Sequence, residues 1–172
     1  MLLRKARKII SGGQTGVDRA ALDFALEFGI ETGGYVPKNR WAEDGKISEK
    51  YPNLIETEND NPTERTKLNV ENSDATLILS HGELQGGSQL TRELAEKYQK
   101  PFLHIDFSIF TVEQAVEKTI KLLNLIEVET LNIAGSRASE DSKIHIKTTQ
   151  FLIKLFLAPR KKAGRVNNKE QR

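Results

Sequence analysis

The stretch KIISGGQTGVDRAALDFALEF, residues 8–28, contains a short apolar run, a glycine-rich turn and an amphipathic segment in succession. The run Ile9–Ile10 predicts a buried strand, and the three glycines that follow permit a sharp turn. Between Val17 and Phe28 the apolar residues recur at three- and four-residue spacing, which is typical of a helix with one buried face. A glycine turn between a strand and a helix either holds phosphate or is simply a tight turn, and this stretch alone favours neither.

The same alternation of strand and helix repeats along the rest of the chain. Apolar runs predict further strands at residues 32–37, 75–80, 101–106 and 130–135. Amphipathic stretches predict further helices at residues 62–73, 86–99, 111–125 and 143–158. Residues 38–61 hold turn formers and charges without a period, so we expect a long loop there. The pattern predicts an α/β fold, a Rossmann-like three-layer sandwich with a mainly parallel sheet of about five strands.

Length and composition limit the classes of protein to be considered. We expect residues 1–158 to form a single ligand-binding domain and residues 159–172, with six basic residues and one acidic residue, to be a disordered tail. The absence of cysteine excludes disulfides, thiolate metal ligands and a cysteine nucleophile. No apolar run approaches the ~20 residues of a membrane span, and the N-terminus lacks the features of a signal peptide. We therefore expect a cytoplasmic protein without a membrane partner.

Polar or glycine-rich segments follow four of the predicted strands. These segments are residues 11–16, 37–44, 81–88 and 135–137. Because the carboxyl ends of parallel strands lie at one edge of the sheet, we expect the four segments to meet there, where such folds bind ligands.

The two glycine turns have groups that suit an anion. Thr15 and Asp18 resemble a capping box, which predicts a helix start near Gly16 with free amides and a positive dipole end. In the second turn Ser88 and Thr91 are spaced to lie on one face of the next helix, where we expect both hydroxyls to be within reach of one phosphate. Asp18 opposes an anion, and for Ser88 a simple role as a helix cap is the alternative.

Five segments in this order resemble the molybdenum carrier family, which is similar to the LOG phosphoribohydrolases and the DNA-processing protein DprA. The segments are SGGQTGVDRAALDFAL, GYVPKNRWAEDGKIS, RTKLNVENSDATLIL, GGSQLTRELA and LNIAGSRAS. The resemblance covers about residues 8–157. It implies a Rossmann-like sheet and a homo-oligomeric protein, a dimer or tetramer, that carries or stores a phosphorylated or anionic small molecule. The ligand that it implies is the molybdenum cofactor, molybdopterin, with no metal held directly by the chain.

The resemblance also implies which residues bind the ligand. They are Gly12, Gly13, Gln14, Thr15, Gly16, Asp18, Pro37, Lys38, Arg40, Glu43, Asp44, Gly45, Arg65, Asn69, Gly86, Gly87, Ser88, Thr91, Gly135, Ser136 and Arg137. The arginines among them suit bidentate contact with phosphate or molybdate oxygens. Two positions depart from the family: Asn39 stands where glycine is frequent, and Trp41 where a basic or small residue is expected. Trp41 either stacks on a pterin or base, or covers the loop.

Two other functions remain open at this stage. A nucleoside-monophosphate phosphoribohydrolase would use Glu93, with Asp18 as a second carboxylate, but QGGSQLTRE departs from the relatives' P-G-G-x-G-T-x-x-E at the proline and the Gly-Thr pair. A DprA-like nucleic-acid-binding module would depend on the basic tail and on the loop rich in arginine and lysine. A binding protein is favoured over an enzyme, and nucleic acid is the less favoured partner. Of the histidines, we place His81 near the site and His104 in the core, and their spacing predicts no metal site.

Overall fold

The structure is a computed structural model, and it describes residues 6–157. Its centre is a six-stranded sheet in which every neighbouring pair of strands is parallel. In spatial order the strands are β5 (Leu54–Glu56), β2 (Glu31–Val36), β1 (Lys8–Ile10), β8 (Thr130–Gly135), β6 (Ala75–Ser80) and β7 (Phe102–Asp106). The predicted tail at residues 159–172 lies outside the described residues.

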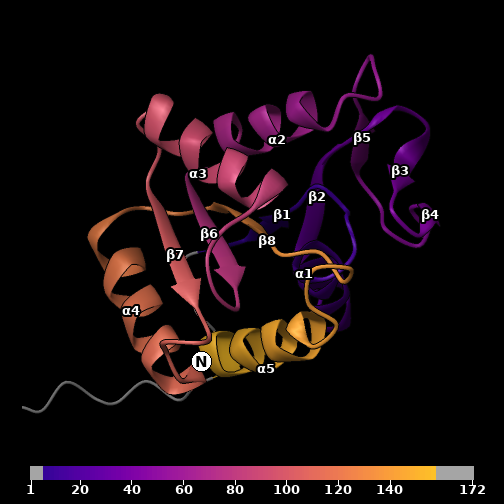
Figure 1. Ribbon diagram of the computed structural model, residues 1–172. Coiled ribbons are helices and arrows are strands. Elements are labelled where there is room, and N and C mark those ends of the chain that lie inside the picture. The colour runs from indigo at the N-terminus through magenta and orange to yellow at the C-terminus, as the bar shows by residue number, and fades with distance from the viewer. Residues whose placement is uncertain (1–5, 158–172) are drawn as a thin grey trace, which may run out of the picture.

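Helices cover both faces of this sheet (Figure 1). One face carries α2 (Pro62–Glu71) and α3 (Gly86–Lys97). The other carries α1 (Val17–Glu27), α4 (Val112–Leu125) and α5 (Ile144–Leu157). This is the predicted Rossmann-like α/β sandwich, with every predicted helix and strand in place to within about three residues of its expected bounds.

The prediction of a long loop over residues 38–61 is wrong. This segment holds a 3-10 turn, η1 (Lys38–Arg40), and a two-stranded antiparallel hairpin of β3 (Trp41–Ala42) and β4 (Gly45–Lys46). It then forms β5, which pairs with β2 and gives the sheet a sixth strand instead of about five. Strand β5 has three residues and lies at the sheet edge with Ile55 54% exposed, so its sequence lacks the buried apolar run that marks the other strands.

The two faces of the sheet have separate apolar cores. The larger core lies under α1, α4 and α5 and includes the rings of Phe24, Phe151 and Phe156. A smaller one under α2 and α3 contains Val70 and Leu94. All six residues of β6 are buried, as expected for a central strand with helices on both sides.

The position of the last strand creates the crevice at which ligands bind in such folds. Strand β8 pairs with β1 on one side and β6 on the other. The helices that follow β8 and β6, α5 and α3, lie on opposite faces (Figure 1). Strand order therefore reverses between β8 and β6, and the turns after β1, β8 and β6 border the resulting crevice.

The turns after β1 and β8 touch at Gly16. Helix α1 begins after Gly16, as predicted, but without a side-chain cap, so the predicted capping box of Thr15 and Asp18 is wrong. The Val17 N–H donates to the Ser136 carbonyl at 3.1 Å. Gly16 has φ of +78°, and a Cβ there would lie 2.3 Å from the Ser136 oxygen. Only glycine permits this contact.

We expect Gly16→Ala to lower the free energy of unfolding by about 3 kcal/mol or more, because a steric clash adds to backbone strain. Gly82 is the matched control, since it has φ of +84° and no atom within 4 Å of its ideal Cβ. Gly82→Ala should cost about 1–2 kcal/mol, the strain alone. Urea unfolding measures both values, and equal losses would contradict the crowding at Gly16.

Candidate functional site

A small cleft opens at the carboxyl end of β8, where strand order reverses. Its lining comes from the turn after β1, from α1, α2 and α3, and from the turn after β8. The lining residues are Gln14, Asp18, Arg65, Thr66, Gly87, Ser88, Thr91, Ala134, Gly135, Arg137 and Glu140. The structure thus brings together eight of the predicted site residues from four separate segments. The cavity measures about 20 Å³, room for about one water molecule.

A buried ion pair forms one wall of this cleft. Nη1 of Arg65 lies 3.4 Å from Oδ2 of Asp18, and the two side chains are 11% and 5% exposed. Burial raises the pKa of Asp18 above its ordinary value, although the positive charge of Arg65 opposes the rise. The guanidinium lies against the backbone of Gly12, where a Cβ would be 1.7 Å from Nη1. Because Gly12 has no side chain, the guanidinium group of Arg65 can lie at this position.

The Nε atom of Arg65 is buried without a hydrogen-bond partner among the residues that the structure describes. A buried N–H group without an acceptor costs on the order of 1–3 kcal/mol, and more when the group is charged. Arg65 lines the cleft, so an oxyanion bound there is a natural acceptor for this N–H.

Helix α3 supplies the opposite wall of the cleft through its first two turns. The N–H groups of the first helical turn have no partners within the helix, and the dipole makes that end positive. The Ser88 hydroxyl donates to the Gln85 carbonyl at 2.7 Å and accepts from the Gln85 N–H at 3.2 Å, so Ser88 belongs to the capping box of α3, in which Gln85 is the N-cap residue. The Thr91 hydroxyl donates to the Gly87 carbonyl at 2.8 Å. Both hydroxyl oxygens keep acceptor capacity, and a rotated hydroxyl can donate to a ligand.

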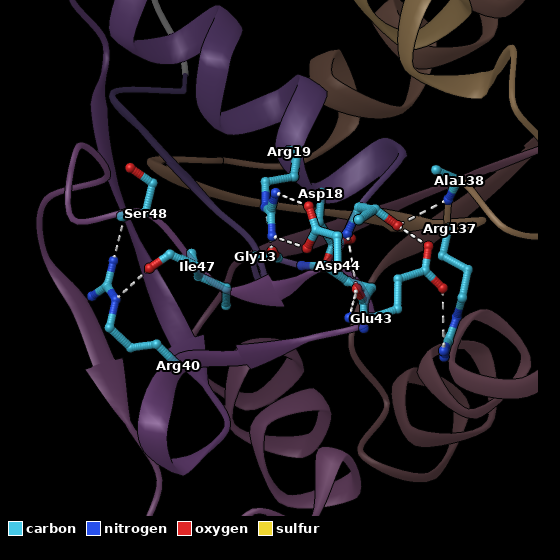
Figure 2. A network of polar contacts seen from close by, with 12 residues as sticks. Gly13, Asp18, Arg19, Arg40, Glu43, Asp44, Ile47, Ser48, Arg137 and Ala138 are labelled. Carbon is cyan, nitrogen blue, oxygen red and sulfur yellow. Dashed lines mark hydrogen bonds and ion pairs between the residues drawn. The ribbon is translucent and has the colours of Figure 1, made fainter.

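Glu43, at the tip of the β3–β4 hairpin, joins the hairpin to the turns after β1 and β8 (Figure 2). Its carboxylate accepts hydrogen bonds from the Thr15 hydroxyl and from both the N–H and the hydroxyl of Ser139. Its own N–H donates to Oε1 of Gln14 at 3.0 Å. The Thr15 hydroxyl oxygen also accepts from the Ala138 N–H at 3.0 Å. Three loops that are distant in sequence are therefore held together around one carboxylate.

Arg137 extends this network into the cleft. Its Nη1 lies 3.9 Å from Oε2 of Glu43, and its Nε lies 3.6 Å from Oε1 of Glu140. Partial burial alone would raise the pKa of Glu43, but hydrogen bonds from Ser139 and Thr15 lower it below its ordinary value, and the charge of Arg137 lowers it further. Glu43 is therefore a carboxylate held in its ionised form.

Asp44 and Arg40, which were also predicted to bind the ligand, hold loops in place and do not line the cleft. Asp44 forms a bidentate pair with Arg19, whose Nη atoms lie 3.0 and 2.9 Å from the carboxylate oxygens. Nε of Arg19 also donates to the Gly13 carbonyl at 2.8 Å. The Arg40 side chain, which is 8% exposed, donates to the carbonyls of Ile47 and Ser48 (Figure 2). Neither Asp44 nor Arg40 belongs to the cleft lining.

Two further members of the predicted set, Asn69 and Lys38, and the two positions that depart from the family, Asn39 and Trp41, are not part of the cleft lining. The Asn69 side chain is hydrogen-bonded to the backbone of Tyr35, since it accepts from the Tyr35 N–H and donates to the Tyr35 carbonyl. Lys38 is exposed. Asn39 has φ of +64°, a left-handed conformation that asparagine tolerates, which accounts for an asparagine where glycine is frequent. Trp41 is half-exposed on the hairpin.

Glu93 and the histidines also lie outside the cleft lining. Glu93 is exposed on α3, where its carboxylate accepts from Gln89 at 2.9 Å. His81 contacts the Asp141 carboxylate. The half-buried His104 ring lies 2.7 Å from the Ser80 hydroxyl, so the predicted core histidine has a partner. In residues 6–157 no group of three histidine, aspartate or glutamate side chains could hold a metal ion.

Several residues of this site carried no recognisable signal in the sequence. Arg19 follows the glycine turn after β1, and Ser139 and Glu140 lie in the turn after β8. Arg19 and Ser139 contact residues of the hairpin, and Glu140 contacts Arg137 of its own turn. Only the wider rule that loops after parallel strands converge could have found them.

A larger hollow of about 710 Å³ lies elsewhere, between the turn after β7 and helix α5. Its lining includes Phe107, Phe110, Lys147 and a mutually paired Glu113 and Lys154. None of the predicted site residues line this hollow.

Comparison with known proteins identifies the family. A family model described as the circularly permutated YpsA SLOG family matches residues 9–156. The chain belongs to this family. The strand order agrees with the description, because placing β8 and α5 ahead of β1 gives the order 4-3-2-1-5-6, which reverses once beside the first strand, as in doubly wound sheets.

A solved structure supports the same assignment within the family. It is that of a "putative molybdenum carrier protein" from Syntrophus aciditrophicus, which is 48% identical, with a TM-score of 0.86 over 90% of this chain and 96% of that chain. The resemblance to the molybdenum carrier family is thereby confirmed. No curated protein matches the chain. Within residues 6–157 no helix has the length and apolarity that crossing a bilayer requires.

We expect Glu43→Gln to lower the free energy of unfolding by about 1 kcal/mol at pH 7, because the hydrogen bonds at this site lose a charged acceptor. The folded pKa of Glu43 lies below its ordinary value of 4.5, so ionised Glu43 stabilises the fold above about pH 4.5, and this contribution disappears as pH falls through the folded pKa. Urea unfolding of wild type and variant at pH 7 and in acid measures the difference. A difference that is unchanged in acid would contradict the role of the charge.

Proposed function

We propose that the chain binds a phosphorylated small molecule in this cleft, and that the molybdenum cofactor is the first candidate ligand. The observation that carries the proposal is the buried, unpartnered Nε of Arg65 in a cleft that Arg137 also lines. Two guanidinium groups and the positive end of α3 are the donors that recognise phosphate. The name of the Syntrophus aciditrophicus relative, at 48% identity, adds support for the molybdenum cofactor.

The donors present suit the phosphate of molybdopterin and leave the metal to the pterin's own dithiolene. Arg65 and Arg137 would hold the phosphate, with Ser88 and Thr91 as neutral partners. When bound, the molybdenum centre is cargo, and the chain's residues orient the molecule and exclude water from its phosphate end. The cleft holds about 20 Å³, room for about one water molecule, so we expect the loops around it to move apart when a molecule of the size of a pterin binds.

We do not extend the proposal to hydrolysis of nucleotides or to binding of nucleic acid. Glu93, on which the hydrolase alternative depended, is exposed and paired with Gln89. The basic tail, on which the nucleic-acid alternative depended, lies outside the described residues. Asp18 lines the cleft, but its carboxylate is in an ion pair with Arg65.

The identity of the ligand is tested by mass spectrometry of small molecules released from freshly purified protein by denaturation. We expect a phosphorylated pterin, with or without molybdenum. Release of a purine nucleotide would keep the phosphate site but replace the molybdenum cofactor as ligand. A complete absence of phosphorylated compounds, also after incubation with cell extract, would contradict the proposal.

The role of Arg65 is tested by titration with inorganic phosphate in a calorimeter. We expect Arg65→Lys to weaken binding about tenfold, because lysine keeps the charge and loses the planar donor pair. Arg92→Lys is the control, since Arg92 is exposed on α3 and paired with Glu96. Equal affinity of the two variants would remove Arg65 from the site.

A further inference from the structure

The charged groups lining the cleft balance one another. Arg65 and Arg137 are opposed by Asp18 and Glu140, and Glu43 adds a further negative charge beside Arg137. Burial lowers the pKa of Arg65, and the positive charge of Arg137 lowers it further, although Asp18 opposes both effects. Each guanidinium group therefore has a carboxylate near it, and an anion that binds between the two groups competes with these carboxylates for them.

The three carboxylates differ in how they are held. Asp18 is buried and also accepts from the Gln14 N–H at 3.2 Å. Glu140 belongs to the same turn as Arg137 and accepts from the Arg137 N–H at 3.1 Å. Glu43 comes from the hairpin, a different segment, and it is joined to the turn after β8 through Ser139 as well as through Arg137. The hairpin therefore separates from that turn when Glu43 leaves both residues.

We propose that Glu43 competes with the anionic group of the ligand for Arg137, so that the β3–β4 hairpin closes the ligand-free cleft and is released when the ligand binds. This inference rests on the proposed function. Glu43 occupies its position through hydrogen bonds from Thr15 and Ser139 as well as through the contact with Arg137. A ligand phosphate offers the same acceptor chemistry with more charge, and it can therefore take over Arg137.

The small volume of the cleft agrees with such an opening. About 20 Å³ accommodates a water molecule but not a phosphate ester. The loops that restrict it are those joined by Glu43, because Gln14 and Arg137 both line the cleft and both contact Glu43. Loss of the Glu43 contacts thus frees two of the lining side chains together.

Calorimetric titration with inorganic phosphate of the full chain tests this competition. We expect Glu43→Gln to bind phosphate about two- to fivefold more tightly than wild type, the range for loss of a partly exposed ion-pair competitor. Glu49→Gln is the matched control, because it removes the same charge from the same loop but from an exposed residue that is paired with Lys46 and Arg40 and not with Arg137. In an Arg137→Ala background, Glu43→Gln should no longer change the affinity.

A second readout follows the hairpin itself. Trp41 is the single tryptophan of the sequence and is half-exposed on β3, so its fluorescence reports the state of the hairpin. Saturating phosphate should shift the wild-type emission toward that of ligand-free Glu43→Gln, and Glu49→Gln should respond to phosphate as wild type does.

The possible outcomes separate this inference from the function on which it rests. Weaker or unchanged binding by Glu43→Gln, while wild type binds phosphate, overturns the competition and leaves the anion site intact. An equal gain in affinity by Glu49→Gln also overturns it, since the effect would then be one of general charge. A lack of phosphate binding by every variant contradicts the proposed function, and the inference is rejected with it.

Discussion

The structure depends on the contact between the first and last strands of the fold. Because β8 pairs with β1, the turns that follow these strands lie side by side, and the Val17 N–H donates to the Ser136 carbonyl. Gly16 permits this approach because it has no side chain. The contact places Arg137 beside the start of α1 and next to the reversal of strand order between β8 and β6. With β8 at an edge of the sheet, the same residues would lie on separate surfaces.

The charges at this junction favour recognition over stability. A buried ion pair such as Asp18–Arg65 contributes little net stability, because desolvation offsets most of its attraction. The pair instead fixes the Arg65 guanidinium against Gly12, with its Nε unpartnered and the guanidinium at the cleft. The fold therefore bears the cost of a buried donor that an anion can satisfy. Glu43 lies outside the cleft lining, where it joins three loops and contacts Arg137.

Local patterns in the sequence predicted most of the fold and part of the site. Apolar runs and amphipathic spacing located the buried strands and the five helices, because burial on one face requires regularly spaced apolar residues and burial on two faces requires a continuous apolar run. Strand β5 and the hairpin were missed, because short exposed strands do not require such a pattern of apolar residues. The place of β8 between β1 and β6 is a non-local pairing that no single segment specifies. The same limit applies to side chains: Arg40 and Asn69 fit the motif, yet their hydrogen bonds are made to the backbone of Ile47 and Tyr35.

The central claim is that an anion binds between Arg65 and Arg137 at the end of β8. A crystal structure of the full chain grown in inorganic phosphate tests it most directly. The account predicts a phosphate within hydrogen-bond distance of Arg65 Nε and Arg137, with Glu43 displaced from Arg137. Phosphate bound elsewhere, with the Glu43 network and the Arg65 Nε unchanged, would contradict it.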